Sequence, residues 1–246
     1  MTEILTTEPI SPKDDAVPGP TPTARLFGLA RVYLTIAVPI LLTLLAVRVV
    51  MMPWFLEFEY NRSGFPADPY GFTTEERLEY APYALNYLSN DADISYLGDL
   101  LFPNGVPMYN QSELRHMEDV KVVTRNAFAL LTFGGLATIV LLALMSRNAI
   151  GRRELRLGLL QGSVLTLSVI GAIVVVAVAM WDTFFTQFHE IFFESGTWRF
   201  AFSDTLIRLF PQQFWFDASL TIGAITTLSA LLVLVMMWVW ARRAIR

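Results

Sequence analysis

The two histidines are the residues of this chain best suited to acid–base chemistry. His116 and His189 carry the only imidazole groups among its 246 residues. Imidazole is the side chain whose unperturbed pKa lies nearest to neutrality, so two of them in one place can take up and return a proton. Each lies beside the end of a hydrophobic segment and outside it. The sequence therefore predicts a shared acid–base site at a membrane surface; the alternative is that each histidine only forms hydrogen bonds there.

Long apolar runs are the elements that must position these histidines. Hydrophobic residues make up 54% of the chain, and its mean hydropathy is +0.48. A helix needs about 20 apolar residues to cross a hydrocarbon core of roughly 30 Å. Four runs are long enough: residues 32–52, 126–146, 157–180 and 218–241. The third is rich in β-branched residues, but its length and its lack of alternation favour a helix and exclude an outer-membrane barrel.

The predicted fold class is all-α: a four-helix transmembrane bundle with a small helical extracytoplasmic cap. Residues 30–241 are expected to form a single membrane domain. Residues 1–29 are polar and rich in proline, which predicts a disordered cytoplasmic tail. They do not resemble a secretory signal, because the span behind them is too long. Residues 242–246 form a basic cytoplasmic end, and the absence of cysteine excludes disulfides and a thiol nucleophile.

The arginines and lysines predict the orientation in the membrane. Ten of them precede the first span, link the second to the third, or follow the fourth. Basic residues accumulate on cytoplasmic flanks, so both termini are expected in the cytoplasm and the active face outside a bacterial cell membrane. The outer segments, residues 53–125 and 181–217, hold seventeen carboxylates against seven basic residues. This acidic balance gives no support to nucleic-acid binding.

The first outer segment is expected to be partly helical. Thr73 followed by Glu76 has the spacing of a capping box, which predicts a helix over residues 75–90. Pro82 is expected to break this helix or to start a second turn. A further helix is predicted to begin near Ser112 and to continue into the second span.

Several charged residues accompany His116 along that helix. Asp119 is three residues on, on the same predicted side. Lys121 and Arg125 approach the bilayer boundary, where they either contribute to catalysis or bind lipid phosphate. Arg48 is the only ionised residue well inside a predicted span. It either reaches the surface as a structural residue or holds a lipid head group or a carboxylate.

The second outer segment is unusually aromatic. Phe and Trp account for thirteen of the thirty-six residues from Trp181 to Phe216. Such rings favour the membrane interface, so one interpretation is an anchoring belt. The other is a slot for acyl chains, lined by residues such as Phe188, Phe192 and Trp198. The polar helical face that carries His189 lies beside the stripe of phenylalanines, which suits a lipid substrate with a polar reacting head.

Several strings in these outer segments resemble a known family. They are Y-N-Q-S-E-L-R-H-M-E-D-V-K at Tyr109–Lys121, F-H-E-I-F-F at Phe188–Phe193, Trp198, and D-T-L-I-R-L-F-P at Asp204–Pro211. They are similar to the signature regions of the four-span bacterial family that includes the lipoprotein intramolecular transacylase Lit. The resemblance covers about residues 32–241. The proline-rich N-terminal tail is not a feature associated with that family.

The resemblance implies an acyltransferase that acts on lipoproteins. Such an enzyme moves the sn-2 acyl chain of a diacylglyceryl lipoprotein to the α-amino group of its own N-terminal cysteine, which leaves a lyso-form lipoprotein. The implied partners are this substrate and membrane lipids. No oligomeric state is indicated.

The reaction needs a base for the amine, donors for the oxyanion and a proton for the leaving glyceryl oxygen. We expect His116, oriented by Asp119, to be the base and His189 to be the proton donor or oxyanion partner; the reverse assignment is also open. Lys121, Arg125 and an outer-segment tyrosine or tryptophan are further candidates for the donor roles. No metal or cofactor is required, although the histidines with nearby carboxylates have the ligand types of a zinc site.

Two other classes of function compete with this one. A noncatalytic membrane scaffold or accessory protein would use the acidic outer part to hold a partner, and relatives that share a fold need not share an activity. An acyltransferase on another lipid would use the same residues. A transporter is disfavoured because the predicted spans carry few ionisable residues at mid-depth.

Overall fold

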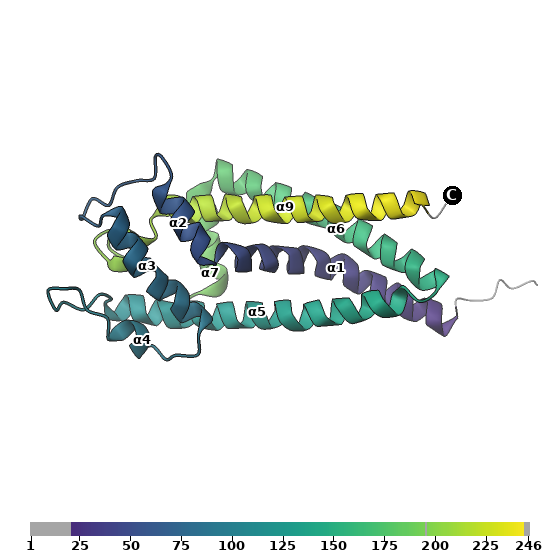
Figure 1. Cartoon of the computed structure of the whole chain (residues 1–246), viewed down its shortest axis with the longest axis horizontal. Helices are drawn as coiled ribbons and strands as arrows, with labels where there is room; N and C mark the ends of the chain where they lie inside the picture. The colour runs from purple at the N-terminus through teal and green to yellow at the C-terminus, as the bar shows by residue number, and fades with distance from the viewer. Residues whose placement is uncertain (1–20, 195, 244–246) are drawn as a thin grey trace, which may run out of the picture.

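The computed structural model describes residues 21–194 and 196–243, and four long helices dominate it (Figure 1). They are α1 (Pro22–Val50), α5 (Gln111–Met145), α6 (Ala149–Ala179) and α9 (Gln212–Arg243). All four are long and apolar enough to cross a membrane. In the described residues the only β-type pairing is one isolated bridge. The all-α fold and the four spans are confirmed.

The first helix begins earlier than the composition suggests. Pro22 occupies the first helical turn, and the Thr21 hydroxyl accepts a hydrogen bond from the Ala24 N–H at 3.3 Å. Phe27 packs against a buried cluster at this end of the bundle. The expectation of a disordered tail over residues 1–29 is therefore wrong from residue 22 onward, because a capped turn and an apolar contact continue the helix. Residues 1–20 and 244–246 lie outside the described residues.

Two glycines allow α1 and α6 to approach closely. A Cβ atom on Gly158 would lie 3.0 Å from the Leu34 Cβ, and one on Gly162 would lie 2.8 Å from the Val38 Cβ. Such small residues four apart let helix backbones pack against each other inside a membrane. An ion pair of 3.0 Å between Arg31 and Glu154 joins the same two helices nearer the end that carries both termini.

Short helices form a cap at the other end of the bundle (Figure 1). They are α2 (Pro53–Asn61), α3 (Thr74–Ser89), α4 (Ser95–Gly98) and α8 (Thr205–Leu209). The Thr73–Glu76 capping box is present at the start of α3, as predicted. Pro82 does not break this helix. The buried face of α3 packs into the cap core on both sides of the proline, which compensates for the hydrogen bond that it removes.

Buried polar bonds connect the two outer segments within the cap. The Tyr60 hydroxyl donates to the Leu209 carbonyl at 2.8 Å, and the guanidinium of Arg77 donates to the Arg208 carbonyl at 3.1 Å. Arg208 in turn forms an ion pair of 2.8 Å with Asp68. Because each link joins residues far apart in the chain, the cap holds the second outer segment at a fixed position against the first.

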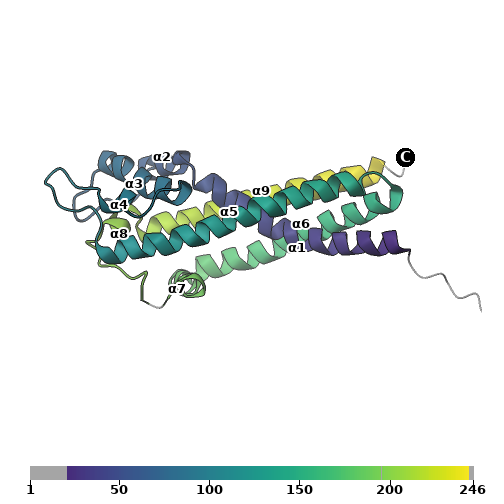
Figure 2. The same cartoon turned by 90° about the horizontal axis from the view of Figure 1, so that it is seen from below.

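One helix runs across the bundle rather than along it. Figure 2 shows α7 (Trp181–Phe192) end-on while the four long helices extend across the picture. None of its residues is buried, and Phe188, Ile191 and Phe192 are exposed on it. A helix with aromatic side chains that follows directly on a membrane span and lies across it is suited to the membrane interface.

Candidate active site

The first turns of α5 determine where His116 lies. Asn110 and Glu113 form a capping box, which begins the helix five residues before the histidine and is typical of a well-defined start. The second carboxylate oxygen of Glu113 accepts the Leu206 N–H at 2.7 Å, so the helix start is tied to α8. His116 is 8% exposed. It lies in the cap portion of α5, ten residues before the apolar run that begins near Asn126.

His189 lies in the last turn of α7, and its ring orientation is set by that helix. Its Nδ1 atom is 2.7 Å from the backbone carbonyl oxygen of Phe185, one turn earlier. A carbonyl oxygen only accepts hydrogen bonds, so Nδ1 carries the proton and the neutral ring has its lone pair on Nε2. The indole of Trp198 covers the imidazole, with ring centroids 4.7 Å apart.

The structure brings the two histidines together from separate helices. The centroids of the His116 and His189 rings are 6.3 Å apart, and their planes differ by 24°. Phe193 and Phe200 close the sides of His116 with edge contacts, at centroid distances of 5.0 and 5.4 Å. The result is an imidazole pair enclosed by aromatic rings.

Burial lowers the pKa of both imidazoles. Removal from water disfavours the imidazolium and lowers the pKa of His116 to about 4, and the neighbouring His189 acts in the same direction. The pKa of His189 is lowered by burial as well, although the hydrogen bond to the Phe185 carbonyl opposes this effect. Both rings are therefore neutral at neutral pH, and each has one nitrogen that accepts and one that donates.

Two buried polar atoms of this site have no hydrogen-bond partner within the described residues. They are the Nδ1 atom of His116 and the Nε1 atom of Trp198. A buried polar group without a partner costs free energy, so each of these two atoms calls for a water molecule or a ligand that completes it. The indole N–H of Trp198 is therefore available as a donor to an oxygen atom of a ligand.

Two of the expected lipid-contacting residues lie next to the imidazole pair. Phe188 and Phe192 are about half exposed on α7, with ring centroids 5.1 Å apart. Phe188 also touches His189, at a centroid distance of 5.7 Å. Phe192 continues this aromatic surface to Phe193, which contacts His116. An apolar surface therefore leads from the outside of α7 to both imidazoles.

The structure does not bring Asp119 or Lys121 to the histidines. Asp119 is exposed, and no hydrogen bond joins it to His116. Lys121 is buried on another face of α5. Its ammonium donates to the Asn90 side chain at 3.2 Å and lies 3.8 Å from the centroid of the Tyr87 ring. Lys121 thus joins α5 to the end of α3.

Arg125 and Arg48 lie together in a different place. Arg125 forms an ion pair with Asp91, and the guanidinium of Arg48 lies 5.0 Å from the centroid of the Phe128 ring. No carboxylate is paired with Arg48 in the described residues; Glu59, eleven positions further along the chain, is paired with Arg62 at 2.7 Å. These two arginines line a pocket that is separate from the imidazole pair.

Sequence reasoning did not identify three groups around the imidazoles. Phe185 contributes its carbonyl oxygen, and Phe193 and Phe200 contribute their rings. The F-H-E-I-F-F string and the aromatic content of this segment were the available signals for the first two. Phe200 lies in an irregular connection, where no periodicity indicates the direction of a side chain.

In the described parts of the chain, no group of three or more histidine or carboxylate side chains lies close enough to hold a metal ion. The zinc interpretation requires such a carboxylate beside the two histidines. The residues that surround the imidazole pair here are aromatic.

Fold and site together define a helical, multi-pass membrane protein with a paired-histidine site where the cap meets the bundle. The sequence model of the family described as lipoprotein intramolecular transacylase Lit matches residues 32–215, and the chain belongs to that family. An uncharacterized protein of Aquifex aeolicus (strain VF5) is 29% identical over 208 residues, which cover 84% of this chain and 92% of that protein.

Solved structures share the fold. The in meso structure of the membrane integral lipoprotein intramolecular transacylase Lit from Bacillus cereus superposes with a TM-score of 0.72 at 19% identity, over 90% of this chain and 97% of that one. A form of the same Bacillus cereus protein in which one histidine is replaced by arginine gives a TM-score of 0.56, and one with alanine gives 0.57, each at 19% identity and over 95% of that chain. They cover 91% and 90% of this chain, respectively.

Proposed function

We propose that the imidazole pair carries the intramolecular acyl transfer for which the family is named. In this reaction the α-amino nitrogen of a lipoprotein's N-terminal cysteine attacks the sn-2 ester carbonyl of the diacylglyceryl group on the same cysteine. A C–N bond forms, the ester C–O bond breaks, and the glyceryl oxygen receives a proton. The observation that carries the proposal is the stacked pair of neutral imidazoles with an aromatic approach.

We assign the role of general base to His189. An α-amino group has a pKa of roughly 8, so the reacting form is the neutral amine, whose ammonium proton has gone to solvent. When its nitrogen attacks, it must lose one further proton to become an amide. The bond from Nδ1 to the Phe185 carbonyl leaves the lone pair on Nε2, which is the arrangement that a base requires. This hydrogen bond therefore favours His189 as the base, whereas the sequence analysis preferred His116. The same Nε2 then returns the proton to the glyceryl oxygen, so that no net charge is left in the site.

His116 and Trp198 are proposed as the donors to the oxyanion. Because its pKa lies far below neutrality, His116 acts as a neutral ring whose Nε2–H donates a hydrogen bond rather than a full proton. The unpartnered indole N–H of Trp198, beside His189, supplies a second donor. Positioned donors of this kind stabilise the tetrahedral intermediate as its charge develops.

The aromatic surface of α7 is proposed to hold the acyl chains. Phe188 and Phe192 face outward from the helix and connect with the rings that flank the histidines. With α7 in the membrane interface, the chains stay in the hydrocarbon layer while the ester reaches the imidazoles. The charge distribution supports an extracytoplasmic site with both termini in the cytoplasm.

Mass spectrometry of lipoprotein N-terminal peptides tests this function. The host is a lipoprotein-producing bacterium that lacks its own N-acylating enzyme and expresses the full chain at matched membrane levels. We expect N-acyl, mono-O-acyl cysteine with the natural sequence and its loss with His116→Ala and His189→Ala. Glu190→Gln, an exposed change next to His189, is the matched control and keeps the product. A noncatalytic scaffold would give no N-acyl product with the natural sequence or with any of the three variants. Peptides that stay diacylated with a free amine in every case would refute the proposal and favour a scaffold or another lipid substrate.

A further inference from the structure

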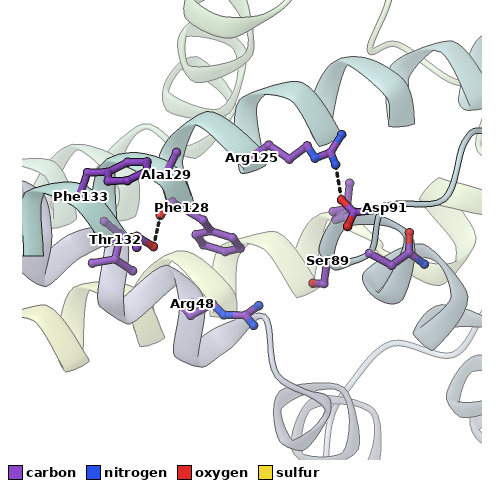
Figure 3. A pocket seen from close by; sticks show the side chains of 11 residues that line it. Arg48, Ser89, Asp91, Arg125, Phe128, Ala129, Thr132 and Phe133 are labelled. Atoms are coloured by element: carbon purple, nitrogen blue, oxygen red, sulfur yellow. Dashed lines mark hydrogen bonds and ion pairs between the residues drawn. The ribbon is translucent and has the colours of Figure 1, made fainter. Parts of the chain in front are cut away.

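We propose that a second, noncatalytic site binds the phosphodiester head group of a membrane glycerophospholipid at Arg48. The site is a pocket of about 500 Å³ between the end of α1, the end of α3 and the middle of α5. Figure 3 shows its residues from close by. The lining that matters for recognition comprises Arg48, Asp91, Arg125, Phe128, Ala129 and Phe133.

This pocket is separate from the imidazole pair because of the geometry of α5. Arg125 follows His116 by nine residues, roughly two and a half helical turns, so the two side chains leave the helix on opposite sides. The pocket is lined from α1, the end of α3 and α5, whereas His189 and the rings around it come from α7 and the chain that follows it. A lipid bound at Arg48 is therefore not the ester that the histidines attack.

The charges of the pocket match a single negative group. Arg48 has no ion-pair partner among residues 21–194 and 196–243, and its guanidinium stacks on Phe128. Arg125 is already paired with Asp91 (Figure 3). The lining thus carries a net charge of one positive unit, centred on Arg48. A phosphodiester carries one negative charge, and guanidinium donors match phosphate oxygens.

The part of the pocket farther along α5 from Arg125 suits an acyl chain rather than a free anion. Phe128, Ala129 and Phe133 line it on the side that continues into the apolar run of α5, and Phe133 is 71% exposed. The Thr132 hydroxyl in this wall donates to the Phe128 carbonyl within the helix, so it offers no free donor. A cation above an apolar wall at the bilayer boundary is complementary to a phospholipid.

Binding to the purified full-length protein in a nonionic detergent tests the proposal, with lipid adducts counted by native mass spectrometry. The probes are phosphatidylglycerol, a diacylglycerol with the same chains, and glycerol 3-phosphate. We expect phosphatidylglycerol to bind and the other two not to. Arg48→Gln should weaken binding by about tenfold, the loss expected for one charge-assisted hydrogen bond. Arg115→Gln removes an equal charge from an exposed position on α5 and is the matched control.

Ala129→Trp supplies a second variant, because it fills the exposed side of the pocket while both arginines stay. It should also abolish phosphatidylglycerol binding, which keeps the test decisive if Arg48→Gln fails to fold. Equal binding of diacylglycerol would show that phosphate is not recognised, and equal binding of glycerol 3-phosphate would show that no lipid is required. Identical affinities of Arg48→Gln and Arg115→Gln would also overturn the proposal. No lipoprotein is present, so the result is independent of acyl transfer.

Discussion

The carboxylate of Glu113 accepts hydrogen bonds from two distant parts of the chain at once, the N–H of Asn110 and the N–H of Leu206, each at 2.7 Å. The first bond caps α5 and the second holds the connection between α7 and α9 against it. The side chain is 1% exposed. One buried residue therefore fixes the start of the helix of His116 relative to the loop that carries Trp198 and Phe200.

Replacing Glu113 by alanine is expected to reduce both stability and acyl transfer. Each backbone N–H left buried without an acceptor costs about 1–3 kcal/mol. Thermal melting in detergent and product formation would be measured together. Glu118→Ala, an exposed change five residues further along α5, serves as the control. Equal melting temperatures for Glu113→Ala and Glu118→Ala would show that the hydrogen bond from Leu206 to Glu113 does not stabilise the protein.

The two histidines are expected to differ in their tolerance to replacement by an amide. Asparagine offers an N–H donor but no base near neutrality. His116→Asn should therefore retain part of the activity, whereas His189→Asn should lose a factor of about 10² to 10⁴. Initial rates of product formation at equal protein levels would show the difference. The opposite ranking would assign the base to His116.

Trp198→Phe is expected to lower kcat without a comparable change in KM. Phenylalanine keeps an aromatic ring against His189 but lacks the indole N–H, so it removes only the donor to the oxyanion. Losing one such donor costs about 10² to 10³ in rate in other acyl-transfer enzymes. Trp198→Ala removes the packing as well and should raise KM too. Unchanged kcat and KM for Trp198→Phe would show that the indole only packs against His189 and does not donate to the oxyanion.

Acidification is expected to destabilise the protein through His116. Its pKa is about 4 when folded and near 6.5 when unfolded, so the unfolded state binds the proton more tightly. Stability is fully present above pH 6.5 and falls as the pH drops toward 4, by on the order of 2 kcal/mol at pH 5. Melting curves at pH 7.5 and pH 5 would show this loss. His116→Phe should show a smaller loss, although His189 still contributes in the same direction.

The contact between α1 and α6 is expected to be intolerant of larger residues at Gly162. Its new Cβ would lie 2.8 Å from the Val38 Cβ, so Gly162→Ala requires the helices to move apart, at a cost of about 1–3 kcal/mol. Gly171, in the same helix, has open space around it, and Gly171→Ala should be neutral or stabilising. The melting temperatures of Gly162→Ala and Gly171→Ala in detergent test this expectation. Equal values would mean that the helix pair adjusts freely.

The fold was predictable because apolar run length and helix capping are local properties of the sequence. The four runs became α1, α5, α6 and α9, and the Thr73–Glu76 pair began α3 as expected. The expectations that failed depended on tertiary contacts. Packing of Phe27 extends α1 back to Pro22, and the cap core carries α3 past Pro82.

The candidate site was only partly predictable from sequence, because direction around a helix matters more than distance along it. His116 and His189 were recognisable as a pair from their places at the span ends. Lys121 is five residues after His116, yet a rotation of roughly 100° per residue turns it toward Asn90. The tautomer of His189 depends on a carbonyl that no side-chain pattern reveals.

The exposure of α7 has a kinetic consequence. With no buried residue, this helix turns its aromatic surface toward the bilayer beside the imidazoles, and the substrate keeps its two acyl chains when one of them moves from oxygen to nitrogen. Two chains hold a protein stably in a membrane, so substrate and product both stay there and exchange by diffusion in two dimensions. Turnover should therefore follow the number of lipoproteins per unit of membrane area, and diluting the proteoliposomes in buffer should leave it unchanged.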